Sequence, residues 1–506
     1  MNLNELFAIA ASRAPDKVAV DFVAGGACQT LTYRELFARA ERVAAGLQRW
    51  GVQPGDRVAF FLGNRPEFVI VYLALLRLGA IMVPINLRYR RLEIAHILTD
   101  CTPVLLITEA GEVDVLADAG VGSRLVIPLL LVEDLASWED ATAAFTAPVV
   151  AAADLALILY TSGTTGRSKG AMISHNNIMA TVTGLLAAWA WQADDRLLLV
   201  LPLFHTHGLV VGLHCALAAG ATVLLRAKFE NAKTLAELES GAVTLFFAVP
   251  TIYVRLVDEL RAAGNVDLSV MRLFCSGSAP LAAETFDAFA RLTGHTILER
   301  YGMTETGMNL SNPYAGPRVA GSVGTPLPGV FMRIVDGQGR DVRVGEEGEL
   351  LVRGSHVFSG YWNAPEKTAA AFGQDDAGER WFMTGDLARQ DPITGYVTLL
   401  GRRHELIISG GFNIYPREIE ELLASYPGIV EAAVVGVPHS HWGEVPVAYL
   451  VCHAHVDDGE LTAYCRANLA SFKVPSVFTR VDALPRNAMG KLQKHLLPVV
   501  SQSTPA

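Results

Sequence analysis

The sequence predicts an α/β protein with a large N-terminal domain, residues 1–400, and a smaller α+β C-terminal domain, residues 401–506. Apolar strand-like segments alternate with helical segments through the first half of the chain, a pattern typical of parallel βαβ units. From about residue 318 to 400, short β segments separated by glycine-rich turns replace this alternation, which predicts a β-barrel-like subdomain. A chain of 506 residues is also too long for a single hydrophobic core.

The N-terminal segments follow this pattern in order. Thr32 and Glu35 have the spacing of a capping box and predict a helix that continues through Arg49. Residues 55–64 predict a strand and a turn, and an apolar helix follows from Pro66 to Gly79. The next strand, helix and strand are predicted at MVPIN (82–86), LEIAHILTD (92–100) and PVLLIT (103–108).

Composition and charge exclude several classes of partner. The formal net charge is −10, and clustered Lys and Arg are scarce, so we expect no nucleic-acid partner. The longest apolar region, residues 197–225, is interrupted by Pro202 and three histidines, which predicts strand, loop and buried helix rather than an integral membrane segment. Six scattered cysteines and an N-terminus without a basic region predict a cytoplasmic protein with free thiols. Monomer and dimer both remain open.

A loop rich in glycine and hydroxyl groups, residues 160–170, follows the apolar strand 155–159. Its sequence is YTSGTTGRSKG, in which the glycines let backbone N–H groups approach an anion, the hydroxyls add donors, and Lys169 adds a charge. It is not a Walker A loop, because its lysine neither follows a glycine directly nor precedes Ser or Thr. We therefore predict a phosphate-binding loop, with a plain surface turn as the alternative.

Three later strands end in loops that should face the same site, because ligands of open parallel sheets bind beyond the carboxyl ends of the strands. These loops are FHTHG (204–208), TIYVRL (251–256) and SGSAPL (276–281). Two histidines two residues apart, without a nearby Cys or Glu, are a weak signal for zinc. We assign them instead to the wall of a substrate channel.

Three further segments carry groups that suit a nucleotide. Tyr301 offers a flat face for a base, and Glu305 is a hard oxygen ligand suited to Mg²⁺. Asp386, in a Thr-Gly-Asp turn, can accept hydrogen bonds from ribose hydroxyls. Lys491 follows a glycine near the C-terminus. Each of these residues alone would usually be a solvated surface group.

Taken in order, the motifs resemble those of the adenylate-forming superfamily, which contains acyl-CoA synthetases, luciferases and peptide-synthetase adenylation domains. The resemblance extends from Thr32 to Lys494. It implies an AMP-forming acid–CoA ligase that uses ATP, Mg²⁺ and coenzyme A and acts on a small carboxylic acid, with a mobile C-terminal domain that rotates between the two half-reactions. Besides the phosphate loop, the motifs are GSAP (277–280), YGMTET (301–306), TGD (384–386), GR (401–402), SGGFN (409–413) and GK (490–491).

The resemblance implies a role for each matching residue. Catalysis is expected from Lys491, Glu305 and His205, and metal binding from Glu305 and Thr165. ATP and AMP binding is expected from Thr161, Ser162, Gly163, Thr164, Thr165, Gly166, Lys169, Gly277, Ser278, Ala279, Pro280, Tyr301, Gly302, Thr304, Asp386 and Arg402. The acyl group is expected at His205, His207, Ser278 and Met303, and the hinge and CoA channel at His404, Ser409, Gly410 and Gly411. His404 stands where the family usually has Asp or Lys.

The acid is predicted to be malonate or a substituted malonate. The combination of PLFHTHGL, VPTIYVRL and MNLSNPYAG is similar to malonyl-CoA synthetases, although Gly307 replaces their usual Asn. Arg255 could clamp a second carboxylate with its planar guanidinium. The alternative for Arg255 is a surface ion pair with Glu259 or Asp258.

Other functions stay open. A medium-chain fatty acid or an aryl acid is the alternative substrate, and a stand-alone adenylation protein that loads a carrier protein is the alternative to CoA transfer. A luciferase-like oxidase and an inactive scaffold are further alternatives. The scaffold is disfavoured because Lys169, Glu305, Asp386 and Lys491 are all present.

Overall fold

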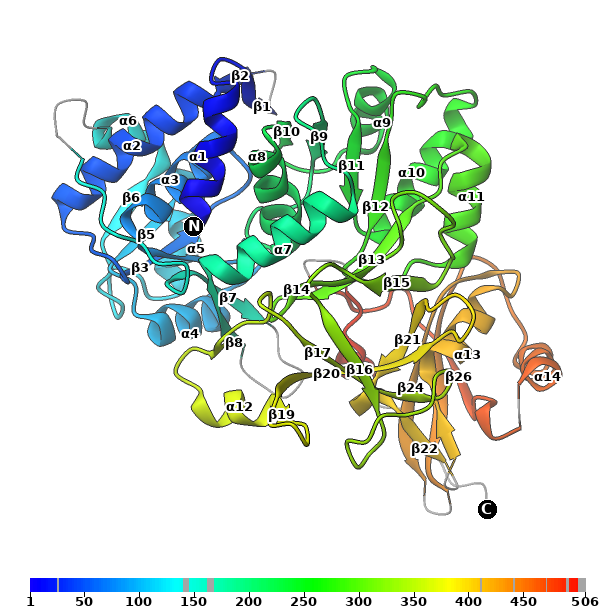
Figure 1. Ribbon diagram of the computed structural model, residues 1–506. Coiled ribbons are helices and arrows are strands. Elements are labelled where there is room, and N and C mark those ends of the chain that lie inside the picture. The colour runs from blue at the N-terminus through cyan, green and yellow to red at the C-terminus, as the bar shows by residue number, and fades with distance from the viewer. Residues whose placement is uncertain are drawn as a thin grey trace.

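The computed structural model describes residues 1–24, 27–139, 145–161, 168–409, 412–439, 442–469, 471–487 and 491–498. The described strands form three sheets, with 14, seven and five strands (Figure 1). The two larger sheets carry the N-terminal part of the chain, and the five-stranded sheet carries the part that begins at Ile407. The α/β class, with a large N-terminal and a small C-terminal part, is confirmed.

The seven-stranded sheet contains the predicted βαβ units. Its five strands β3 to β7 pair in parallel, and β7 and β8 form an antiparallel hairpin around the phosphate loop. The apolar strands β4 and β5 are buried throughout, as parallel strands covered on both faces should be. Its strands, in spatial order, are β18 (Gly360–Tyr361), β8 (Lys169–Ser174), β7 (Leu155–Thr161), β4 (Ile81–Pro84), β3 (Arg57–Phe61), β5 (Leu105–Thr108) and β6 (Leu129–Leu131).

The helices of this part begin and end where local signals predict. The capping box is confirmed, because the backbone N–H of Glu35 donates to Thr32 Oγ1 over 3.2 Å and the N–H of Thr32 donates to Glu35 Oε2 over 2.8 Å. The helices are α1 (Leu3–Arg13), α2 (Tyr33–Trp50), α3 (Pro66–Leu78), α4 (Arg91–Cys101), α5 (Val113–Asp118) and α6 (Leu135–Trp138).

The 14-stranded sheet is parallel from β1 through β10, β9, β11 and β12 to β13. It is antiparallel from β13 onward and at the opposite edge, where β2 pairs with β1. The three strands whose loops were expected to meet, β9, β11 and β12, are neighbours in this sheet. Its strands are β1 (Val18–Ala24), β2 (Ala27–Thr32), β9 (Arg196–Leu199), β10 (Thr222–Arg226), β11 (Leu245–Ala248), β12 (Leu273–Ser276), β13 (Leu298–Met303), β14 (Gly307–Ser311), β15 (Ser322–Pro326), β16 (Phe331–Val335), β17 (Glu347–Arg353), β19 (Phe372–Gln374), β20 (Arg380–Gln390) and β21 (Val397–Arg402).

The β-rich segment from about residue 318 to 400 is antiparallel as predicted, but the prediction of a barrel-like subdomain is wrong. Its strands continue the 14-stranded sheet through β15, which pairs with β14, and they end at the edge strand β16. The strands of the described residues therefore form an open sheet and close no barrel.

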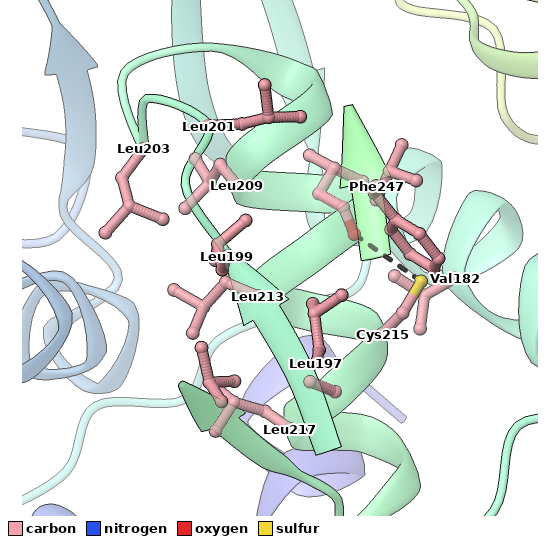
Figure 2. Packing of buried hydrophobic residues seen from close by; sticks show 14 of the residues in the cluster. Val182, Leu197, Leu199, Leu201, Leu203, Leu209, Leu213, Cys215, Leu217 and Phe247 are labelled. Atoms are coloured by element: carbon pink, nitrogen blue, oxygen red, sulfur yellow. Dashed lines mark hydrogen bonds between the residues drawn. The ribbon is translucent and has the colours of Figure 1, made fainter. Parts of the chain in front are cut away.

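The apolar region from residue 197 to 225 is a buried strand, a helical segment and a second strand (Figure 2). Leu199, Leu209 and Leu213 pack together beside Phe247 of β11. No helix in the described part of the chain is both long and apolar enough to span a membrane. The remaining helices of this half are α7 (His175–Ala188), the π-helix η3 (His207–His214), α8 (Cys215–Ala219), α9 (Asn231–Glu239), α10 (Pro250–Ala263), α11 (Ala283–Thr293) and α12 (Pro365–Ala370).

The C-terminal part is an α+β unit, drawn in orange at the lower right of Figure 1. Helix α13 has Pro416 in its first turn with Glu418 behind it, as predicted, and its Ile419 and Leu423 are buried in the core of the unit. The domain boundary at 400/401 falls inside β21 and stays a prediction. The elements are β22 (Ile407–Ser409), β23 (Phe412–Ile414), α13 (Pro416–Ala424), β24 (Ile429–His439), β25 (Gly443–Cys452), α14 (Asp458–Asn468) and β26 (Val477–Arg480).

Candidate active site

A cavity of about 1120 Å³ lies between the two larger sheets and the C-terminal part. The loops after the parallel strands contribute its floor, and the last residues of the C-terminal part contribute one wall. The predicted site residues that line it are Thr161, Lys169, His205, His207, Ser278, Ala279, Pro280, Tyr301, Gly302, Met303, Thr304, Glu305, Asp386, Arg402, His404 and Lys491.

Tyr301, Asp386 and Arg402 form a connected group in this cavity. The Tyr301 hydroxyl donates to Asp386 Oδ2, and Arg402 Nε lies 2.9 Å from Asp386 Oδ1. Burial, and then the Asp386 carboxylate, raises the pKa of Tyr301 well above its usual value, so its hydroxyl stays a donor. A fixed carboxylate beside an aromatic ring fits the ribose and base of a nucleotide.

Glu305 is held by a residue that sequence analysis did not single out. The hydroxyl of Tyr361 in β18 donates to Glu305 Oε1 over 3.0 Å. The Nζ of Lys169 lies 4.5 Å from the centre of the Tyr361 ring. Because β18 pairs with β8, Tyr361 connects the strand after the phosphate loop to the predicted metal ligand.

The residues around Glu305 fit Mg²⁺ bound together with phosphates. No group of three or more His, Cys, Asp or Glu side chains that could hold a metal occurs among the described residues. Mg²⁺ commonly takes one or two carboxylates and completes its shell with phosphate oxygens and water. The single carboxylate of Glu305 is therefore a suitable protein contribution.

Lys491 enters the cavity from the C-terminal part. Its backbone N–H donates to Asn487 Oδ1 over 2.9 Å, and the Asn487 N–H donates to the Lys491 carbonyl over 2.9 Å. Removal from bulk water, and then Arg402, lowers the pKa of Lys491, while Asp386, Glu405 and Glu305 act in the opposite direction. Its ammonium thus lies among the groups assigned to the nucleotide and the metal.

Two neutral imidazoles and a serine lie together in the cavity lining, at the end where the acyl group is predicted to bind. His207 Nδ1 lies 3.2 Å from Ser278 Oγ, and the His207 N–H donates to His205 Nδ1 over 3.1 Å. Burial, and then Arg300, lowers the pKa of His205 to about 4 and that of His207 well below its usual value. Ser278 has a φ of 74°, a strained conformation of the kind found at functional sites.

Arg300 supplies the positive charge at this end. It is 3% exposed, and its Nε and Nη2 have no hydrogen-bond partner among the described residues. Its guanidinium packs on Gly277, where a Cβ would lie 2.5 Å from Arg300 Cζ. Buried donors without partners are costly, so they indicate where an acceptor from a ligand would bind.

Arg255, the predicted acyl clamp, does not reach the cavity. It is exposed on α10 and is absent from the cavity lining. The buried face of α10 is formed by Ile252, Tyr253, Leu256, Val257 and Leu260, and helical spacing turns Arg255 away from it. The predicted partner Asp258 pairs instead with Arg261 over 3.3 Å. Arg300 lines the cavity and Arg255 does not.

Several predicted residues lie elsewhere. Ser409 is buried in β22 and does not line the cavity. His404 lines the cavity, and burial lowers its pKa while Glu405, 3.9 Å away, opposes this effect. Thr161 and Lys169 are paired across the β7–β8 hairpin and so hold the two ends of the phosphate loop. The predicted residues outside the described part of the chain are Ser162, Gly163, Thr164, Thr165, Gly166, Gly410 and Gly411.

Two protein-family models match the chain. Residues 7–362 match the AMP-binding enzyme model, and residues 418–491 match the model of the AMP-binding enzyme C-terminal domain. The chain belongs to the AMP-binding enzyme family. This AMP-binding enzyme is an AMP-forming acid–CoA ligase, the class that the sequence motifs predict.

Relatives of this AMP-binding enzyme include CoA ligases for different acids. It is 37% identical over 510 residues to the mitochondrial malonate–CoA ligase ACSF3 of Mus musculus, with 92% of this chain and 85% of that protein covered. It is 36% identical over 471 residues to a feruloyl-CoA synthase of an Amycolatopsis species, with 92% of each chain covered.

The AMP-binding enzyme also resembles solved structures of MatB from Rhodopseudomonas palustris. MatB is 41% identical, and the comparison covers 98% of both chains. The TM-score is 0.89 for the ATP-bound structure and 0.79 for the apo structure. The present structure is therefore more similar to the ATP-bound structure than to the apo structure.

Proposed function

We propose that this AMP-binding enzyme activates malonate or a substituted malonate with ATP and then transfers the acyl group to coenzyme A. The observation that carries this proposal is Arg300, a buried guanidinium at the acyl end whose Nε and Nη2 lack partners among the described residues. A second carboxylate on the acid would pair with this cation, whereas an alkyl or aryl group would leave it buried without a counter-charge.

The electrostatics of the acyl end support a dianionic acid. His205 and His207 are neutral at neutral pH, so Arg300 is the cation that a distal carboxylate would meet there. Ser278 Oγ and His207 can add hydrogen bonds to the same carboxylate, because they lie 3.2 Å apart and both line the cavity. The relatives named malonate–CoA ligase and the similarity to MatB agree with this substrate.

In the first half-reaction, one carboxylate oxygen of the acid attacks the α-phosphorus of ATP and pyrophosphate leaves. Lys491 would stabilise the charge that develops between the carboxylate and the α-phosphate, and Asp386 would hold the ribose. Mg²⁺, when bound at Glu305, would neutralise the charge of the phosphates. The phosphate-loop residues, including Thr165, keep their predicted roles.

In the second half-reaction, the thiolate of coenzyme A attacks the acyl-adenylate and AMP leaves. We assign the rotation of the C-terminal part to the hinge at His404, and the thiol channel to residues 409–411. The cytoplasmic location inferred from the sequence stays a prediction, and the relatives from mouse, cattle and human are named mitochondrial.

The test is AMP formation with ATP, Mg²⁺ and coenzyme A across malonate, methylmalonate, acetate, octanoate and benzoate. We expect the malonates to be preferred. Arg300→Met should lower kcat/KM for malonate at least about a hundredfold, because it removes a buried charge-assisted contact. Arg255→Ala is the matched control and should leave kcat/KM unchanged.

Two outcomes would contradict the proposal. Preference of the wild type for octanoate or benzoate would restore the medium-chain or aryl alternative. Release of AMP that does not increase with coenzyme A, but increases with a phosphopantetheinylated carrier protein, would favour carrier loading.

A further inference from the structure

A side chain of the C-terminal part bonds to the 14-stranded sheet at the edge of the cavity. Arg417 lies in α13, and its Nη1 donates to the carbonyl oxygen of Leu399 in β21 over 2.6 Å. Its side chain is 13% exposed, and its Nε pairs with Glu421 Oε1 over 2.7 Å within α13. Leu399 precedes His404, the proposed hinge, in the sequence, and Arg417 follows it. The contact therefore depends on how the C-terminal part is placed against the sheet.

A buried carboxyl group of the large sheet lines the same cavity as Arg417. Glu299, in β13, is 3% exposed, and its Oε1 accepts a hydrogen bond from the Leu281 N–H over 3.2 Å. Its Oε2 has no hydrogen-bond partner among the described residues. Burial raises the pKa of Glu299, and Arg417 is the main charge that opposes this effect. Glu299 also precedes Arg300 in the chain.

Two observations connect this contact to the first half-reaction. Lys491 lies in the cavity together with Arg417, Glu299 and Leu399, which all line it. The arrangement of the chain is also closer to that of ATP-bound MatB, with a TM-score of 0.89, than to that of apo MatB, with 0.79. The contact of Arg417 is thus present in the arrangement in which Lys491 lines the cavity.

We propose that Arg417 is a positioning residue for adenylation: its bond to Leu399 holds the C-terminal part so that Lys491 lies in the cavity. This inference rests on the two half-reactions of the proposed function, but it does not require malonate to be the acid. A rotation about the hinge would separate Arg417 from Leu399, because the two residues lie on opposite sides of His404. The thioester half-reaction would then proceed without this contact.

The consequence is a shift in population. The contact exists in one arrangement and not in the other. Removing it destabilises the first arrangement by the free energy of the contact, so a smaller fraction of the enzyme adopts that arrangement. Adenylation should therefore slow while the chemistry of the thioester step is left intact. A residue that merely stabilised the fold would affect both half-reactions alike.

The experiment measures the two half-reactions separately in the full-length enzyme. Adenylation is followed as pyrophosphate–ATP exchange with the acid that the wild type prefers, and the thioester step as conversion of a supplied acyl-adenylate with coenzyme A. We expect Arg417→Gln to lower the exchange rate about tenfold or more and to keep the thioester rate within about twofold. Arg417→Lys, which retains the charge, should restore part of the exchange rate.

Arg480→Gln is the matched control. Arg480 also makes an ion pair, with Asp458 over 2.5 Å, and its Nη2 donates to the Val456 carbonyl over 2.6 Å, but these partners belong to the C-terminal part itself. Its substitution should leave the ratio of the two rates unchanged.

Equal losses in both half-reactions of Arg417→Gln, an unchanged exchange rate, or a loss confined to the thioester step would each overturn the inference. If Arg417→Gln does not fold, Arg417→Lys decides by the same ratio. Failure of the malonate proposal would appear in the wild type as preference for another acid. The two proposals can therefore fail independently.

Discussion

The guanidinium of Arg300 packs directly on Gly277 and leaves no room for a side chain there: a Cβ at position 277 would lie 2.5 Å from Arg300 Cζ and 2.6 Å from its Nη1. The guanidinium can occupy the acyl end of the cavity only while residue 277 lacks a side chain. We therefore expect the glycine of the GSAP motif, predicted to contact the nucleotide, to affect binding of the acid as well.

Gly277→Ala should displace Arg300 and lower kcat/KM for a malonate about tenfold or more, since an overpacked buried site costs roughly 1–3 kcal/mol. Binding of ATP, measured by calorimetry, should change much less. Gly337→Ala is the control, because a Cβ there meets no atom within 4 Å. Equal losses of ATP binding and acid turnover would show that the substitution disturbs the whole cavity.

Tyr361→Phe should raise the Mg²⁺ concentration that the enzyme needs for activity. The variant keeps the aromatic ring below Lys169 and removes the hydroxyl that fixes Glu305 at 3.0 Å. Loss of a hydrogen bond that orients a metal ligand typically costs tenfold or more in metal affinity. Titration of activity with Mg²⁺ at saturating ATP should give a half-maximal concentration about tenfold higher. An unchanged half-maximal Mg²⁺ concentration would contradict the assignment of Glu305 as a metal ligand.

Glu299→Gln should change how stability depends on pH. Burial, opposed first by Arg417, raises the pKa of Glu299 from its usual value to about 7 in the folded protein. Between pH 4.5 and 7 the unfolded chain has released this proton and the folded chain has kept it, so the free energy of unfolding falls as pH rises through this window.

The variant removes this dependence. Its stability relative to the wild type should increase from pH 5 to pH 8, by on the order of 3 kcal/mol at most. Urea denaturation at the two pH values measures the difference. Parallel stability curves for the two proteins would mean that Glu299 does not titrate in this range.

Lys494→Met should destabilise the C-terminal part. The Nζ of Lys494 lies 3.0 Å from Glu405 Oε2 and 2.7 Å from Glu420 Oε1, and its side chain is only 13% exposed. The variant leaves two carboxylates without their cation, which should lower the free energy of unfolding by about 1–3 kcal/mol. Thermal denaturation measures the loss. Lys233→Met, which breaks an exposed pair with Glu230, should have almost no effect.

The elements that the sequence predicted best are those whose signals are local. The capping box at Thr32 and Glu35 and the apolar runs of β4 and β5 depend on neighbouring residues, and the structure confirms them. The three strands β9, β11 and β12 are neighbours, and two of the three loops predicted to face the site line the cavity, FHTHG (204–208) and SGSAPL (276–281). The third, TIYVRL (251–256), lies in α10, and none of its residues lines the cavity. The chemical roles of those loops stay predictions.

What the sequence did not predict depends on contacts between distant segments. The pairing of β15 with β21 joins residues about 75 positions apart, such as Ser322 and Thr398, and it decides that the β-rich segment is open. Arg300 was missed because a charged residue inside a buried strand contradicts the usual pattern. A buried strand that contains Arg next to Glu was nevertheless a signal that could have been used.

Arg402, which pairs with Asp386, lies only two residues before His404. If the chain turns at His404, Asp386 would stay in place with the large sheet, because it precedes the hinge in β20. Lys491, which follows the hinge, would be carried out of the cavity with the C-terminal part. The nucleotide would then stay bound to Asp386 throughout the rotation. The adenylate formed in one arrangement would still be in place when the thiol of coenzyme A reaches it in the other.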